Sequence, residues 1–271
     1  MKRTARSRAE ARGLEETFTD RFELGLQRVG EVLNPLDGKV YPIGQSSSPR
    51  YYHKEADVAD RMKSLGVFER DILGEMPRNR LGILRIRKSG FFSSRVTRLV
   101  IVAATCSPLE EFILEGSSSR RLDLAEMNRV VDEVVKQEDI FYFIGVLSTT
   151  GWSDDCKGRL PQGPNYLLAA VENIGGSRWQ VDKTPDKRWG RVFSAFDAET
   201  RPEKLARCQA YFAENTDLAL KGGHVVLEVA SELLGVPDDI FRRAVDEAAR
   251  RDPDLAVMEV SGKKILKRAR I

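Results

Sequence analysis

The sequence predicts an α+β protein in which an N-terminal helix, a mixed α/β domain and a small helical domain follow one another. Apolar residues recur at steps of three or four over residues 14–33, which is typical of an amphipathic helix. Short runs rich in branched and aromatic residues, bounded by Gly, Pro, Ser or Asn, occupy residues 79–200 and indicate strands. Three helical stretches and a β-like pair broken by "SGKK" then follow. The regions that we expect are an N-terminal helical region at 1–75, a mixed α/β domain at 76–200 and a C-terminal domain at 201–271.

The helix predicted over residues 14–33 has one apolar side and stops at "NPLDG", because proline and glycine both break helical continuity. Its apolar residues are Leu14, Phe18, Phe22, Leu26, Val29 and Leu33. Such a stripe packs on its own domain or against a second subunit. A homodimer through this helix is therefore one interaction that we consider.

The middle domain combines apolar strands with one helix. The strands are expected at "LGILRI", "TRLVIVAA", "FYFIGVL" and "NYLLAAVE", and the helix at "LDLAEMNRVVDEVVKQ", residues 122–137. This pattern contains one strand–helix–strand unit, but not the steady alternation of a doubly wound fold. We therefore expect a central mixed sheet.

Composition excludes several classes of protein. The 271 residues are 41% hydrophobic, and no apolar run approaches the ~20 residues that a membrane span needs. No apolar segment follows the basic N-terminus, so we expect no secretory signal. Cys106, Cys156 and Cys208 form no CxxC pair, which indicates reduced thiols and a cytoplasmic location. With His53 and His224 as the only histidines, a His-rich metal site is excluded.

Basic residues gather in three acid-poor segments. Residues 2–12 hold five basic side chains and one acid, whereas residues 77–98 hold seven basic side chains and no acid. The last nine residues hold five basic side chains and no acid. Clusters of this kind suit a polyanionic partner, although each could also serve solubility and local ion pairing.

Residues 201–271 resemble the winged-helix superfamily. The order is a helix at 201–220, a very short strand "HVVL", a second helix ending in "ASELLGVP", a third helix "DDIFRRAVDEAARRD" and a hairpin with "SGKK" as its wing. Pro237 followed by two acids is a sound start for the third helix, because acids favour the positive end of a helix dipole.

The resemblance implies a nucleic-acid site. In winged-helix proteins, which are related to the helix-turn-helix, the third helix usually lies in the DNA major groove and the wing touches the backbone. The residues that would contact nucleic acid here are Arg242, Arg243 and Arg250 on the helix, and Lys263, Lys264, Lys267 and Arg268 on the wing and beyond it. From the middle domain we add Arg85, Arg87 and Lys88. Acids interrupt the third helix, so its gain from phosphates is small and the wing is the better basic surface.

The loop "STTGWSDDCKGRLPQGPN", residues 148–165, is the place where chemistry could occur, because α/β proteins place ligand sites at strand ends. A metal-dependent nuclease would need carboxylates around Mg²⁺ and a nearby lysine. Asp154, Asp155, Glu172 and Lys183 are the candidates for that set. However, "QVDK" places Asp182 directly before Lys183, so their side chains would point to opposite faces of a strand. The simpler interpretation is a surface loop whose Trp152 folds back on the core.

The function that we expect is nucleic-acid binding, with duplex DNA as the target, in transcription regulation or maintenance of a DNA element. This function needs no catalysis and no cofactor. The first alternative is the nuclease or another nucleic-acid enzyme, which alone would need Mg²⁺. The second alternative is a protein-assembly factor that uses the winged helix as a protein contact.

Overall fold

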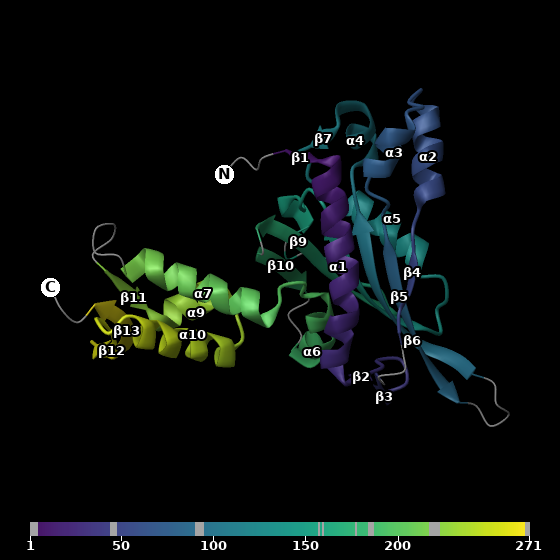
Figure 1. Cartoon of the computed structure of the whole chain (residues 1–271). Helices are drawn as coiled ribbons and strands as arrows, with labels where there is room; N and C mark the ends of the chain where they lie inside the picture. The colour runs from purple at the N-terminus through teal and green to yellow at the C-terminus, as the bar shows by residue number, and fades with distance from the viewer. Residues whose placement is uncertain are drawn as a thin grey trace. The chain divides into compact units, whose positions relative to one another are not determined.

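The computed structural model describes residues 5–43, 48–89, 95–156, 158, 160–176, 178–183, 187–216 and 223–268, without the side chains of Lys88, Ser89, Arg95 and Lys187. The chain folds as two units, Met1–Ala198 (unit 1) and Glu199–Ile271 (unit 2). Helices and a six-stranded mixed sheet occur together in unit 1, so the predicted α+β class is confirmed (Figure 1).

Unit 1 is built on a sheet with the strand order β10-β9-β8-β6-β5-β4. The strands are β4 (Arg50–Tyr52), β5 (Leu81–Ser89), β6 (Arg95–Cys106), β8 (Phe141–Ser148), β9 (Tyr166–Gly175) and β10 (Arg178–Lys183). β6, β8 and β9 are parallel, and the other neighbours are antiparallel. Every residue of β8 is buried, as expected for a strand that is covered on both faces.

Helices cover both faces of this sheet (Figure 1). Alternate residues of β6 point to opposite faces, so Leu99 and Ile101 enter one core while Val100 and Val102 enter the other. The first core holds α1 (Arg8–Val29), α6 (Gly190–Phe193) and the 3₁₀ turn η3 (Ser194–Phe196). The second core holds α5 (Leu124–Val134). The sheet therefore separates two apolar layers.

α1 begins six residues earlier than predicted, because Ser7 and Glu10 form a capping box. It ends at Gly30, whose φ of 72° is not helical. Phe18, Phe22 and Val29 are almost fully buried in the first core. The apolar stripe therefore packs on its own unit. These buried side chains are not available to a second subunit, and the homodimer that we considered stays a prediction.

Residues 1–75 do not form a region apart from the sheet. α2 (Glu55–Ser64), α3 (Arg70–Glu75) and α4 (Leu109–Glu115) pack with the N-terminal part of α1 in one apolar cluster. The side chains of Ala11, Val58 and Phe112 meet there without exposure to solvent. The boundary expected at 75–76 is absent for this reason. The smaller elements of unit 1 are β1 (Arg6–Ser7), β2 (Glu31–Leu33), β3 (Val40–Pro42), β7 (Ser117–Ser118), η1 (Asp154–Cys156) and η2 (Lys187–Trp189).

A close approach of backbones fixes α1 against the turn that follows α6. A Cβ added at Gly25 would lie 2.3 Å from the carbonyl oxygen of Ala195 and 2.8 Å from its Cα. Glycine is the residue that permits this spacing, since any side chain would meet backbone atoms that cannot rotate away.

Unit 2 holds α7 (Arg201–Thr216), β11 (His224–Val226), α9 (Leu227–Leu234), α10 (Asp238–Arg251), β12 (Leu255–Val260) and β13 (Lys263–Arg268). Its strands form an antiparallel sheet in the order β11-β13-β12. Gly235, with φ of 58°, ends α9, and Pro237 precedes α10. Residues 217–220 of the helix expected at 201–220 lie outside the described residues.

The β12–β13 hairpin turns on two residues. Ser261 and Gly262 both have positive φ, 52° and 74°, and the flanking Val260 and Lys263 are paired. Positive φ at both central positions is the mark of a tight turn that matches the twist of the strands. The "SGKK" break in the sequence is therefore the tip of a hairpin.

A buried ion pair secures unit 2. Both oxygens of Glu199, a residue that is only 1% exposed, accept hydrogen bonds of 2.7 Å from Arg207. Arg207 also donates to the carbonyl oxygen of Leu234, at the end of α9. The bidentate pair holds the Arg207 side chain in place, and the bond from Arg207 to Leu234 ties α7 to the end of α9.

None of the helices in the described ranges is both long and apolar enough to cross a membrane.

Candidate nucleic-acid interface

The β12–β13 hairpin presents lysines on both of its faces. Lys263 is paired with Val260, Lys264 with Glu259, and Lys267 with Ala256 on one side and His224 on the other. Because side chains alternate along a strand, Lys263 and Lys267 share one face and Lys264 lies on the other.

The face that holds Lys263 and Lys267 carries no acid among the described strand residues. Its other members are His224, Val226, Ala256, Met258, Val260 and Ile265. Within the described part of the chain, none of the three lysines makes an ion pair or a side-chain hydrogen bond, and Lys263 and Lys264 are exposed. Arg268 differs, because it pairs with Asp252 at 2.8 Å. The positive charge of the hairpin therefore comes from three lysines.

α10 buries Ile240, Phe241, Ala244 and Val245, and it turns its charged residues outward. Between Asp238 and Arg251 it holds four arginines and four acids, which leaves no net charge. Because phosphate neutralisation provides most nonspecific affinity, this helix by itself is a weak polyanion surface.

The three predicted arginines of α10 differ in their contacts. Arg243 donates to Glu247 at 2.7 Å, and this hydrogen bond lowers the pKa of Glu247. Arg242 and Arg250 make no ion pair with any described residue, and both are exposed. Arg242 and Arg250 are therefore available to a ligand as they stand, whereas Arg243 would have to leave Glu247.

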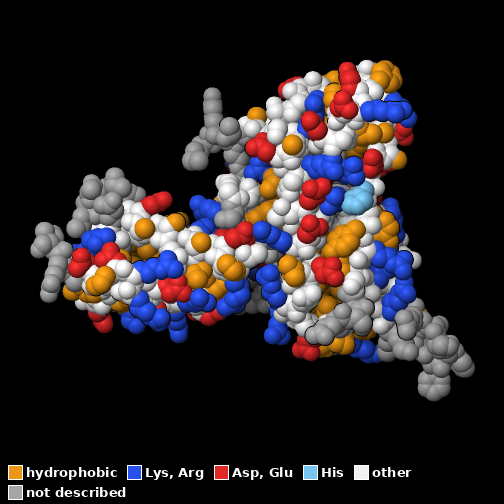
Figure 2. Space-filling model, viewed as in Figure 1, with side chains coloured by type: hydrophobic (Ala, Val, Ile, Leu, Met, Phe, Trp, Pro, Cys, Tyr) orange, Lys and Arg blue, Asp and Glu red, His pale blue; other side chains and the backbone are white. Residues whose placement is uncertain are grey.

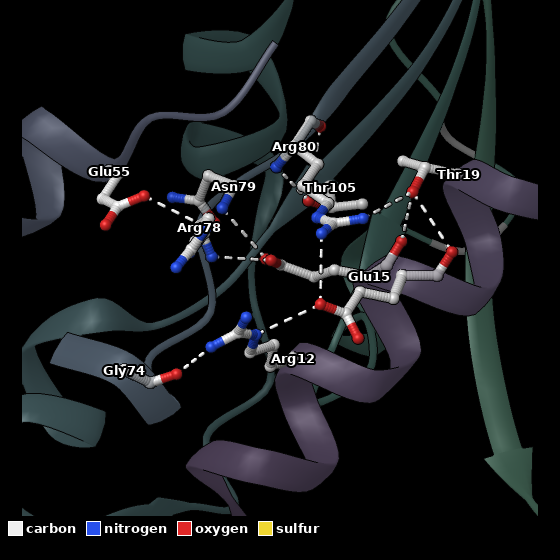
Figure 3. Close-up of polar contacts among 10 residues, drawn as sticks. Arg12, Glu15, Thr19, Glu55, Gly74, Arg78, Asn79, Arg80 and Thr105 are labelled. Atoms are coloured by element: carbon white, nitrogen blue, oxygen red, sulfur yellow. Dashed lines mark hydrogen bonds and ion pairs between the residues drawn. The ribbon is translucent and has the colours of Figure 1, made fainter. Parts of the chain in front are cut away.

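The 78–98 cluster divides into two groups with different roles. Arg78 pairs with Glu55 at 3.1 Å, and Arg80 pairs with Glu16 at 3.1 Å (Figure 3). These two arginines join parts of unit 1. Arg85 and Arg87 lie farther along β5 and are exposed, and the side chain of Lys88 lies outside the described residues.

Glu15 is a buried polar residue that no sequence pattern marks, since it is one of several acids on α1. It accepts hydrogen bonds from the backbone N–H groups of Arg78 (2.6 Å) and Asn79 (3.1 Å) (Figure 3). It also accepts one from the hydroxyl of Ser107 at 2.9 Å. Burial raises its pKa, because the charged form loses its hydration. Glu15 therefore anchors α1 to the segment before β5 and to the end of β6.

The four residues proposed for a nuclease do not come together. Asp154, with 84% of its side chain exposed, pairs with Arg121 at 3.1 Å, and Asp155 accepts a hydrogen bond from Ser153. The buried Glu172 accepts from the backbone N–H of Trp152 at 3.2 Å.

The strand register separates the lysine from the buried acid. Glu172 lies opposite Gln180, whereas Lys183 lies opposite Ala169. These positions differ by an odd number, so Glu172 and Lys183 point to opposite faces of the sheet. Among the described residues, no three His, Cys, Asp or Glu side chains are grouped so that they could hold a metal ion. The alternation of the strands thus separates Lys183 from Glu172, and the nuclease stays a prediction.

Trp152 belongs to the core, as the simpler interpretation of its loop predicts. It is 1% exposed, and its indole N–H donates to the carbonyl oxygen of Val171 at 3.0 Å. Cys156 is also buried, and desolvation raises the pKa of its thiol, which is the reverse of what an activated nucleophile needs.

No protein-family model, curated protein or solved structure matches this chain. A functional assignment therefore rests on the residues and their geometry alone.

Proposed function

We propose that this protein binds nucleic acid, with duplex DNA as its target, through the β12–β13 hairpin of unit 2 and the adjoining α10. The observation that carries the proposal is the hairpin itself, whose three lysines are not neutralised by ion pairs with described residues. The order α7, β11, α9, α10, β12, β13 also supports a winged-helix module, in which such a hairpin contacts the DNA backbone.

The role proposed for each residue follows from its contacts. Lys263, Lys264 and Lys267 provide salt-dependent affinity for phosphates. Arg242 and Arg250 approach the DNA from α10, with their acid neighbours limiting the gain. Such binding suits transcription regulation or maintenance of a DNA element, and it requires neither catalysis nor a cofactor. The three buried, unpaired thiols support a reducing compartment, and we propose a cytoplasmic location.

The test is fluorescence anisotropy of the full chain on a labelled random-sequence duplex across a salt series. The triple variant Lys263→Ala/Lys264→Ala/Lys267→Ala is expected to bind tenfold to a hundredfold more weakly, that is by about 1.4–2.8 kcal/mol. Its slope of log K against log salt should be smaller by roughly 2.7, because about 0.9 is lost for each phosphate contact removed.

A matched control separates local contacts from net charge. The exposed lysines Lys39, Lys63 and Lys136 of unit 1 are replaced together by alanine, which removes the same charge. Equal effects of the two triple variants, or no binding by the wild type at low salt, would overturn the proposal.

A second function remains open because unit 2 exposes apolar side chains. Val229 and Leu233 lie one turn apart on α9 and are 57% and 63% exposed. This pair suits a protein contact, as an assembly factor would need. A partner protein retained by the full chain at high salt, and lost in Val229→Asp/Leu233→Asp, would support that function if DNA binding were absent.

A further inference from the structure

Unit 1 holds a second basic surface on the edge strand β4 and its neighbour β5, where the fold adds Arg50 and Tyr52 to Arg85 and Arg87, which the sequence indicates. Arg50 lies opposite Ile83, and Tyr52 lies opposite Leu81. Arg85 and Arg87 follow on β5 at alternate positions. Because alternate residues of a strand share a face, Arg85 lies on the same face as Arg50 and Tyr52. Arg87 follows it across an irregularity in the pairing of β5 with β6. All four side chains are exposed, and Figure 2 shows Lys and Arg side chains along this margin of unit 1.

The two adjacent tyrosines of β4 lie in opposite electrostatic surroundings. Hydrogen bonds from Arg85 and Arg50, together with their charges, lower the pKa of Tyr52. On the other face, burial and the nearby carboxylates of Glu23 and Asp20 raise the pKa of Tyr51 to about 12. The face that contains Tyr52 is thus the positive one.

The arginines of this surface have no acid to neutralise them. Among the described residues, none of Arg50, Arg85 and Arg87 forms an ion pair with Asp or Glu, although Arg78 and Arg80 of the same segment both do. Arg50 and Arg85 instead lie near the phenol of Tyr52, which carries no full charge. Guanidinium side chains without an acidic partner can take an anion from outside, and their planar donors match the oxygens of a phosphate.

We propose that Arg50, Tyr52, Arg85 and Arg87 form a second phosphate-binding surface, which holds the sugar-phosphate backbone of a nucleic acid against the edge of the unit 1 sheet. Arg85 and Arg87 lie about 6.7 Å apart along β5, so they meet different phosphates or different oxygens of one phosphate. The Tyr52 hydroxyl has an O–H that can donate to a phosphate oxygen of the backbone. The inference shares the ligand class of the proposed function but none of its residues.

The experiment measures binding of the full chain to the labelled duplex with Arg85→Ala/Arg87→Ala. We expect about tenfold weaker binding and a salt slope smaller by roughly 1.8, for two contacts of about 0.9 each. The control is Arg70→Ala/Arg129→Ala, which removes two exposed charges elsewhere in unit 1. Equal effects of the two double variants would overturn the inference.

The tyrosines provide a second readout without a change of charge. Tyr52→Phe is expected to weaken binding twofold to threefold, whereas Tyr51→Phe leaves it unchanged. Equal effects of the two changes would contradict a role for the Tyr52 hydroxyl. Inorganic phosphate serves as a separate probe, at an ionic strength matched with chloride. If phosphate binds the wild type but not Arg85→Ala/Arg87→Ala, and both bind the duplex equally well, the surface is a free-anion site and its assignment to a nucleic-acid backbone is wrong.

Comparing Arg85→Ala/Arg87→Ala with the triple variant of the hairpin lysines distinguishes the two sites. Loss of affinity from Arg85→Ala/Arg87→Ala with none from the hairpin lysines would sink the proposed function and keep this inference. The reverse result would keep the proposed function and sink the inference.

Discussion

Replacing Gly25 by alanine is expected to lower the free energy of unfolding of unit 1 by about 3 kcal/mol, because the new methyl group would collide with backbone. The added Cβ would lie 2.3 Å from the carbonyl oxygen of Ala195. α1 or the turn after α6 must therefore shift, and the buried layer that both elements share must repack.

A second glycine of α1 provides a control, because its replacement by alanine should change the free energy of unfolding in the opposite direction. Gly13 is exposed, and a Cβ built there meets nothing within 4 Å. Gly13→Ala is expected to raise the free energy of unfolding by about 1 kcal/mol, since alanine is the better helix former. Guanidinium unfolding of the full chain, followed by tryptophan fluorescence, measures both effects. Trp152, Trp179 and Trp189 all belong to unit 1, so the signal reports this unit alone. Two variants of equal stability would contradict the packing of α1 described above.

Glu15→Ala is expected to lower the free energy of unfolding of unit 1 by about 3 kcal/mol, since the loss would leave buried donors without a partner. The N–H groups of Arg78 and Asn79 and the hydroxyl of Ser107 all donate to this carboxyl group. Water cannot replace it readily, because Glu15 is fully buried.

Glu16 is the matched control for Glu15, one residue further along α1. Its carboxylate is 39% exposed and pairs with Arg12 and Arg80, both at 3.1 Å. Exposed ion pairs contribute little, so Glu16→Ala is expected to cost about 0.5 kcal/mol. The measurement is again tryptophan-detected guanidinium unfolding. If both variants lose the same small amount of unfolding free energy, Glu15 does not anchor the segment before β5.

The loss of stability in Glu15→Ala should depend on pH, and its direction follows from the direction in which the pKa of Glu15 is shifted. Burial raises the pKa of Glu15 above its ordinary value of 4.5, so the folded state binds the proton more tightly than the unfolded state. The stability that this group contributes is complete below 4.5 and is lost as the pH rises through the folded-state pKa. The destabilisation caused by Glu15→Ala should therefore shrink as the pH rises from 4.5 through the folded-state pKa of Glu15. A destabilisation that grows over this range would show that the charged form is the one favoured by the fold.

The spacing of apolar residues determined most of the secondary structure. The stripe from Phe18 to Val29 marked α1, the run "FYFIGVL" marked β8, and "SGKK" marked the tip of the β12–β13 hairpin. Each of these signals is local, because the period of the side chains follows directly from the geometry of a helix or a strand.

What packs against each element was decided only by the tertiary structure. The stripe of α1 could have met a second subunit, and the fold instead closes it over the sheet. The acids at 154, 155 and 172 could have met in one place, and the register of β9 and β10 keeps the expected lysine on the other face.

The arginines of residues 78–98 show most clearly which features follow from the sequence and which follow only from the tertiary structure. In the sequence they form one acid-free run, and the sequence determined that this run is basic. The fold brings Glu55 and Glu16 to Arg78 and Arg80, whereas Arg85, beside the neighbouring strand β4, has no acidic partner among the described residues. An ion pair depends on distance through space and not along the chain, so only the tertiary structure decided which arginines stabilise unit 1 and which remain for a ligand.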